Sequence, residues 1–167
     1  DPIEMIEPAF NQMQVNPGVD LHFSDGIRSL MRQDPDIIMV GEIRDAETAN
    51  MAVQASLTGH LVLSTLHTND APSSITRLHD LGIQPFLTSA TILGVMAQRL
   101  LRTLCPRCKQ ALDVTADSEI AIQWQELVQP WRAPVPAQIY KAQGCEHCRH
   151  TGYQGRVGLY EIMPLSN

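Results

Sequence analysis

Several patterns that would narrow the function of this 167-residue chain are missing from it. No Gly-x-x-x-x-Gly-Lys-Ser/Thr loop occurs, so the chain does not contain the backbone cradle that many ATPases use for nucleotide phosphates. No apolar run approaches the ~20 residues that a membrane-spanning helix needs. The net charge of −6 argues against a general nucleic-acid coat, because phosphate binding requires clustered Lys and Arg. The remaining composition, with 44% hydrophobic residues, is that of a globular domain with a small appendage.

Two apolar runs in the first half of the chain each lead to a polar residue. Ile37–Val40 is followed by glycine and then Glu42, and Leu61–Leu66 is followed by His67. Runs of this length predict buried strands of a parallel α/β sheet. Ligands of such sheets lie beyond the carboxyl ends of the strands. The two polar residues are therefore candidates for a nucleotide site.

Helical spacing and capping residues place helices around these strands. Asp45 is expected to cap a helix over residues 46–57, and Gly59 follows its end. Further helices are predicted from about residue 25 to before Pro35 and over residues 73–81, 85–104 and 118–128. Residues 1–23 favour a hairpin-like excursion, and residues 157–163 favour a strand that returns to the main sheet. The alternation of strands and helices predicts parallel pairing through βαβ crossovers.

The chemistry of the two strand-end residues has a functional and an ordinary interpretation. Glu42 is placed to hold the water shell of a phosphate-bound Mg²⁺ or to orient the attacking water. It could equally be an ordinary strand-end carboxylate. His67 can donate a hydrogen bond to a γ-phosphate, although a lone strand-end histidine is more often structural. His60 stands at the start of its strand, farther from the expected nucleotide.

The four cysteines form two Cys-x-x-Cys corners, Cys105 with Cys108 and Cys145 with Cys148. Four thiolates suit a tetrahedral Zn²⁺ in a closed structural site. Because the chain shows no secretory signal pattern, a cytosolic metal site is expected rather than disulfides. Two redox pairs are the alternative, but no thioredoxin-like context surrounds either corner. The segment between the corners is too small for a core of its own, so the metal would stabilise it.

Long, ordered stretches of the sequence resemble the secretion ATPases of type II secretion and type IV pilus assembly. The resemblance is carried by residues 1–4, 11–16, 27–36, 34–45, 59–70, 144–148 and 151–161. It implies an α/β fold with a partial RecA-like P-loop ATPase core over residues 1–104. A tetracysteine zinc-binding subdomain would occupy residues 105–152, and residues 153–167 would return to the ATPase domain. In that family the Walker A loop precedes the point where this chain starts, and further helices follow, so we expect a C-terminal ATPase fragment.

The resemblance also implies roles for individual residues. Glu42 corresponds to the Walker B glutamate, and His67 lies in the histidine box. Asp1 and Glu4 are similar to the aspartate box, whose acids face the nucleotide, so Glu4 is a catalytic candidate. Arg44 is a candidate for binding the nucleotide. An arginine of this region could act as an arginine finger or form a surface ion pair, and the sequence does not choose between these roles. The candidates are Arg28, Arg32, Arg44 and Arg77.

By the same resemblance, the intact protein would be a cytoplasmic hexameric ATPase at the cytoplasmic face of the bacterial inner membrane. It would use ATP, Mg²⁺ and Zn²⁺ and drive pilus or pseudopilus assembly through an inner-membrane platform protein. No nucleic-acid partner is expected, and membrane association would occur only through partners. Secretion, pilus extension and DNA uptake stay open, while retraction motors of the family lack the tetracysteine module. The rival hypothesis is a zinc-ribbon module that binds nucleic acid or protein without catalysis, against which the acidic balance argues.

Overall fold

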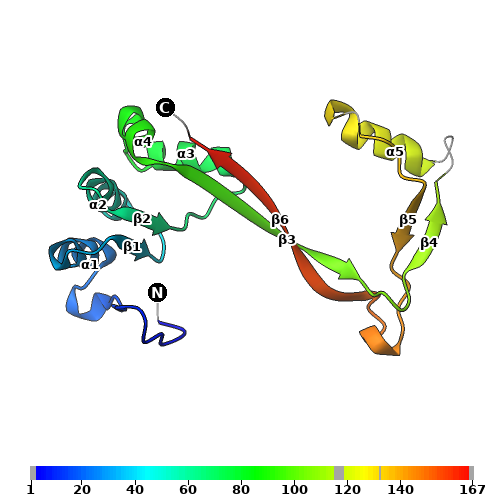
Figure 1. The fold of residues 1–167 in the computed structure, drawn as a ribbon, viewed down its shortest axis with the longest axis horizontal. Helices are drawn as coiled ribbons and strands as arrows, with labels where there is room; N and C mark the ends of the chain where they lie inside the picture. Colours follow the sequence, from blue (N-terminus) through cyan, green and yellow to red (C-terminus); the bar gives the residue numbers. More distant parts are fainter. Residues whose placement is uncertain (1–2, 115–118, 132, 166–167) are drawn as a thin grey trace. The chain divides into compact units, whose positions relative to one another are not determined.

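The computed structural model describes residues 3–114, 119–131 and 133–165 (Figure 1). The chain forms two compact units, which are considered separately. The first unit contains residues 1–98 and 160–167, and the second contains residues 99–159. Asp1, which the sequence places in the aspartate box, lies outside the described residues.

The first unit contains the predicted parallel βαβ arrangement. Strand β1 (Ile37–Val40) pairs in parallel with β2 (Leu61–Ser64), and helix α2 (Ala46–Leu57) makes the crossover. Both predicted end signals of α2 are confirmed. The Oδ1 atom of Asp45 accepts the Thr48 N–H at 2.7 Å, and Gly59 adopts a left-handed conformation with φ of 99°. The prediction of an α/β fold is therefore confirmed.

One face of the β1–β2 sheet is covered and the other is not. Helix α1 (Phe23–Leu30) and the 3-10 turn Met31–Gln33 end before Pro35, as predicted. α1 and α2 pack on β1 around a cluster of buried residues, which are Ile27, Ile38, Val40 and Ala55. Alternate residues point the other way, and among them Ile37 and Met39 are 58% and 71% exposed. The prediction of two buried strands is therefore wrong, because the helices of the described residues cover a single face of the sheet.

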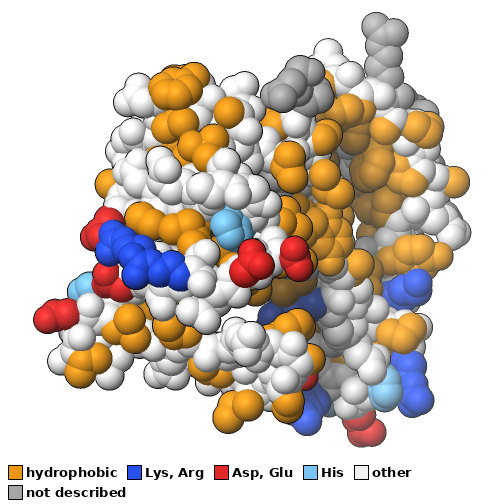
Figure 2. Space-filling view, turned by 60° about the vertical axis from the view of Figure 1, so that its left-hand side comes forward, with side chains coloured by type: hydrophobic (Ala, Val, Ile, Leu, Met, Phe, Trp, Pro, Cys, Tyr) orange, Lys and Arg blue, Asp and Glu red, His pale blue; other side chains and the backbone are white. Residues whose placement is uncertain are grey.

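Two further helices complete the packing around α2. These are α3 (Ala71–Asp80) and α4 (Pro85–Thr91). Ala49 of α2, Leu78 of α3 and Ile83 between the two helices form a second buried cluster. Many other hydrophobic side chains remain at the surface, as the space-filling view shows (Figure 2).

The helix predicted over residues 85–104 is wrong in its second half. α4 ends at Thr91, Ile92 is extended, and strand β3 runs over Gly94–Leu104. Glycine is a poor helix former, and the apolar residues that follow fit a strand as well as a helix. Pairing with strand β6 (Tyr153–Pro164) decides in favour of a strand. The approach is close at Gly94, where a Cβ would lie 3.3 Å from the carbonyl oxygen of Met163.

Two other expectations also fail. The strand predicted over residues 157–163 forms as part of β6, but it pairs with β3 and not with the β1–β2 sheet. The hairpin-like excursion over residues 1–23 is not formed either, since the described part, residues 3–22, contains a single isolated bridge, between Asn16 and Leu21. A 3-10 turn at Pro17–Val19 connects the two bridge residues, and the ladder cannot extend beyond the bridge because helix α1 begins at Phe23.

The second unit contains the predicted short helix together with a strand pair that the sequence did not indicate. Helix α5 (Glu119–Val128) continues into the 3-10 turn Gln129–Trp131. β4 (Gln110–Asp113) pairs in antiparallel fashion with β5 (Gln138–Lys141), and a 3-10 turn covers Glu146–Cys148. None of the helices in the described ranges has the length and apolar character that crossing a bilayer requires.

Candidate functional sites

The carboxyl ends of β1 and β2 meet at one edge of their sheet. The Ile43 N–H donates to the carbonyl oxygen of Thr65 at 3.1 Å, and the Thr65 hydroxyl donates to the carbonyl oxygen of Gly41 at 2.6 Å. These two bonds join the loop after β1 to the loop after β2. The side chains of Glu42 and His67 are thereby brought to the same place, as parallel pairing predicts.

Three of the predicted site residues are in contact at this edge. The Glu42 carboxylate contacts the Arg44 guanidinium, and its second oxygen lies 3.2 Å from Nε2 of His67. The Glu42 side chain is only 3% exposed, whereas the side chains of Arg44 and His67 are 66% and 86% exposed. The arrangement is a buried acid flanked by two cationic or potentially cationic groups that reach solvent.

The environment of Glu42 favours its ionised form. The neighbouring Arg44 guanidinium holds the pKa of the Glu42 carboxyl below its ordinary value, burial acts in the opposite direction, and His67 lowers it further. Within the described residues neither buried carboxylate oxygen has a well-aligned hydrogen bond, although both lie at ion-pair distance from a partner. Buried acceptors that lack an aligned donor are uncommon and are often found where water or an ion binds. A carboxylate held ionised in this way can accept hydrogen bonds from water or from the water shell of a cation once Arg44 or His67 moves aside.

His67 occupies the centre of a tight turn. The Thr68 N–H donates to the carbonyl oxygen of Leu66 at 3.1 Å, and the Thr68 hydroxyl lies 2.8 Å from the Ser74 hydroxyl of α3. The loop is thus held in place while the imidazole remains exposed. His60, which directly precedes β2, differs because its Nδ1 lies 2.9 Å from the carbonyl oxygen of Ala55 in α2.

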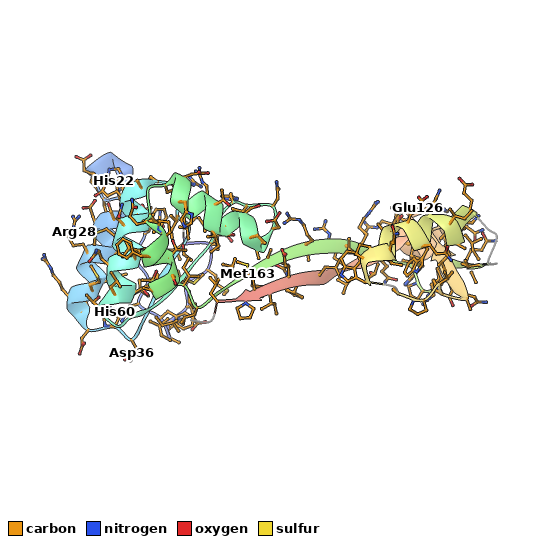
Figure 3. All side chains as sticks on the ribbon, turned by 90° about the horizontal axis from the view of Figure 1, so that it is seen from above. His22, Arg28, Asp36, His60, Glu126 and Met163 are labelled. Atoms are coloured by element: carbon orange, nitrogen blue, oxygen red, sulfur yellow. The ribbon has the colours of Figure 1, made fainter. Side chains whose placement is uncertain are left out.

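The other predicted residues of this site do not join the cluster. Glu4 is exposed in the segment before α1, and no contact links it to Glu42 or His67 among the described residues. Arg28 lies on the surface, 3.3 Å from Asp25, in an ion pair of the kind that contributes little. Figure 3 places Arg28 on the outer side of the first unit and His60 beside Asp36, whose carbonyl oxygen accepts the Leu61 N–H at 3.0 Å.

The second unit gathers the four cysteines. Their sulfur atoms all lie within 4.8 Å of one another. The Sγ atom of Cys148 lies 3.8 Å from those of Cys108 and Cys145. Zn–S bonds of ~2.3 Å in a tetrahedron place the sulfurs about 3.8 Å apart, so the spacing fits one zinc ion. Cys105 and Cys148 are buried and the other two are half-buried, as a closed site requires.

Backbone N–H groups donate hydrogen bonds to the cluster and help to orient its sulfurs. The N–H groups of Cys145 and Gly152 donate to the Cys148 sulfur, each at 3.2 Å, and the Cys105 N–H donates to the Gly152 carbonyl oxygen at 2.9 Å. Burial alone would raise the pKa of the Cys148 thiol, but these N–H groups, together with the Cys108 and Cys145 thiols, lower it to about 6. Gly152 is required here, because its φ is 77° and a Cβ would lie 2.6 Å from the Cβ of Ala142.

Two structural partners of these sites were missed by sequence reasoning. Thr65 joins the two strand-end loops, and Glu161 accepts the Ala71 N–H at 2.8 Å from a position 90 residues away. Both lie in stretches that carry the family resemblance, at residues 59–70 and 151–161. Residue type alone could not assign them, because their partners are backbone groups.

Comparison with known proteins identifies relatives over the full chain. The family described as type II/IV secretion system protein matches residues 1–167. The type IV pilus assembly ATPase TfpB of Acinetobacter baylyi is 68% identical over 165 residues, which cover 99% of this chain and 27% of the relative. The type II secretion system ATPase E of Vibrio cholerae is 54% identical over 163 residues, which cover 98% of this chain and 31% of the relative. This chain thus spans between a quarter and a third of the length of these relatives.

A solved structure supports the fold. The X-ray structure of the Legionella pneumophila ATPase DotB matches with a TM-score of 0.52 and 34% identity. The match covers 61% of this chain and 31% of that one.

Proposed function

The chain belongs to the type II/IV secretion system protein family, and from this membership we propose that it supplies hydrolytic residues of an ATP-driven motor. The observation that carries the proposal is the buried Glu42 carboxylate beside His67 and Arg44 at the carboxyl edge of a parallel sheet. Ligands of such sheets bind at this edge. The relatives named above are ATPases of pilus assembly and type II secretion. A phosphate-binding loop, which these 167 residues do not contain, would come from the rest of the polypeptide.

The three clustered side chains would each have a different role at the nucleotide. Glu42 would accept a hydrogen bond from the attacking water or from the water shell of the cation, because its oxygens lack aligned donors. His67, within 3.2 Å of Glu42, would turn to a γ-phosphate oxygen when ATP is present. Arg44 would add positive charge beside the phosphates. When bound, Mg²⁺ would neutralise charge on the β- and γ-phosphates. Glu4 remains a weaker candidate from sequence.

The cysteine cluster would stabilise the fold of the second unit and would take no part in ATP hydrolysis. Cys105, Cys108, Cys145 and Cys148 would hold one Zn²⁺ with no coordination position left for substrate. Four thiolates in a tetrahedral arrangement are typical of zinc sites. Contact with another component of the machine is the role that remains for this module.

The larger assembly is proposed from the family alone. We expect a homo-hexamer at the cytoplasmic face of the inner membrane that drives pilus or pseudopilus assembly through a platform protein. The uncovered face of the β1–β2 sheet supports burial in a larger structure, since Ile37, Met39, Leu61 and Leu63 are all exposed.

Replacing Glu42 tests the proposed function. In a polypeptide that includes a phosphate-binding loop, Glu42→Gln should leave ATP binding within about threefold and lower turnover by ~10²-fold or more. The matched control is Glu126→Gln, which changes an exposed glutamate of α5 (Figure 3) and should have no effect. A loss of turnover smaller than about threefold at Glu42 would show that this carboxylate is a bystander.

A further inference from the structure

The first residue of α3 is capped from a distant strand. The Ala71 N–H donates to Oε2 of Glu161 at 2.8 Å, and Ala71 is fully buried. The first N–H groups of a helix have no partner within the helix, and a carboxylate there also interacts favourably with the helix dipole. The Asp70 side chain accepts the Ser73 N–H at 2.8 Å, so two carboxylates share the N-terminus of α3.

This cap lies at one end of the loop that carries His67. The other end is fixed by Thr65, whose hydroxyl donates to the Gly41 carbonyl oxygen. Between these ends, the turn centred on His67 is closed by the Thr68 N–H, and the Thr68 hydroxyl contacts Ser74 in the first turn of α3. The imidazole position therefore depends on two anchors, the strand-end loop at Gly41 and the N-terminus of α3.

We propose that Glu161 is a positioning residue for His67, which it holds against the Glu42 carboxylate by anchoring the N-terminus of α3. Glu161 lies in β6, outside the two loops that carry the cluster, and touches neither His67 nor Glu42 directly in any contact described above. Its effect on the imidazole would pass through Ala71 and the loop of residues 65–70. The consequence for turnover rests on the proposed function, whereas the consequence for the position of His67 does not.

Solution NMR of the 167-residue chain with labelled histidine rings tests this directly. Glu161→Met keeps the side-chain length but removes the acceptor, and Glu161→Gln keeps an acceptor oxygen. We expect Glu161→Met to shift the His67 ring signal more than any of the other five histidine signals, including that of His79 in α3. Glu161→Gln should return the signal most of the way, and Glu126→Gln should leave it unchanged. An unchanged His67 signal in a folded Glu161→Met chain overturns the proposal, as does an equal shift of His79.

A second measurement decides the matter if Glu161→Met does not fold. Glu161→Gln replaces the charged acceptor of the Ala71 N–H with a neutral one, so the Ala71 amide signal should shift, while the amide signal of Ser73, which donates to Asp70, should stay in place. An Ala71 amide signal that is the same in both chains shows that Glu161 does not anchor α3 and overturns the proposal.

Turnover measures the catalytic consequence separately. In a polypeptide with a phosphate-binding loop, Glu161→Met should lower kcat about three- to tenfold while KM for ATP stays within about twofold, because positioning is lost and binding is not. Glu161→Gln should restore most of kcat. A shifted His67 signal with unchanged kcat would overturn the catalytic part. If the unaltered polypeptide hydrolyses no ATP, the proposed function fails while the NMR result still decides the role of Glu161.

Discussion

Glu42, Arg44 and His67 come from two loops and meet at one edge of the β1–β2 sheet. Glu42 is buried among them, and a buried carboxylate is retained only when nearby charges compensate for its lost hydration. Arg44 and His67 supply that compensation from solvent-exposed positions. Because both side chains are exposed, either could move away from Glu42 without leaving a core, as the proposed function requires.

Acid should remove the stability that Glu42 contributes. Because Arg44 lowers the pKa of Glu42 below its ordinary value of 4.5, the folded state binds this proton less tightly than the unfolded state does. The contribution is therefore fully present above about pH 4.5 and is lost as the pH falls through the folded pKa. Urea unfolding of the unaltered chain and of Glu42→Gln should show a difference in midpoint that shrinks below about pH 4.5. A difference that stays constant down to about pH 3 would contradict this assignment.

The strand-end positions of Glu42 and His67 could be predicted from the sequence, since each follows an apolar run. The contact of Arg44 with Glu42 could not, because Asp45 stands next to Arg44 and offers a nearer carboxylate. The structure uses Asp45 as the cap of α2, which leaves Arg44 to pair with Glu42. Competition of this kind is decided by three-dimensional geometry rather than by residue spacing.

At the scale of single elements, α2 depends on its cap. Asp45→Ala should lower the free energy of unfolding by about 1 kcal/mol, because the Thr48 N–H loses its acceptor. Glu47→Ala is the matched control, since it removes an exposed acid from the same first turn without touching the cap, and should cost no more than about 0.5 kcal/mol. Equal losses in the two variants would show that charge near the helix dipole, and not the capping bond, accounts for the effect.

Elements with signals at both ends were predicted well. α2 begins after a capping aspartate and ends before a glycine, and its predicted bounds match the structure. The helix predicted over residues 85–104 has a proline at its start, and its apolar residues keep helical spacing beyond Thr91, so the prediction runs on into β3. β4 and β5 are four residues each and acquire their identity only from pairing with each other.

At the scale of the whole molecule, the two units are stabilised in different ways. The first has two clusters of buried apolar side chains around α2. In the described part of the second unit, the buried hydrophobic residues are Cys105, Ala121 and Cys148. Two of these three are cysteines of the cluster, so the second unit has little apolar core apart from it. The sequence could predict that the four cysteines lie together, because two Cys-x-x-Cys pairs are typical of one metal site, but it could not predict how little core surrounds them.

Metal removal should therefore destabilise the second unit while the first unit stays folded. We expect the purified chain to carry one Zn²⁺, and chelation or Cys145→Ser should increase amide hydrogen exchange across residues 99–159. β1 and β2 should keep their protection, because no cysteine contributes to either core cluster of the first unit. The control is Thr151→Ser, which preserves the hydroxyl that donates to the carbonyl oxygen of Cys148 and should leave the exchange unchanged. Less than about a tenth of an equivalent of zinc, or uniform loss of protection over the whole chain, would contradict the assignment.

If these residues form a working part of an ATPase, they should support turnover in a chimera with a relative. The chain would replace the corresponding 165 residues of the Acinetobacter baylyi pilus assembly ATPase TfpB, to which it is 68% identical. The measurement is ATP turnover of the chimera, with the isolated chain and a Glu42→Gln chimera alongside. We predict turnover within about threefold of the relative, loss of at least ~10²-fold with Glu42→Gln, and none from the isolated chain, which contains no phosphate-binding loop. A folded chimera that binds ATP but hydrolyses it no faster than its Glu42→Gln variant would show that these residues do not form a working part of an ATPase.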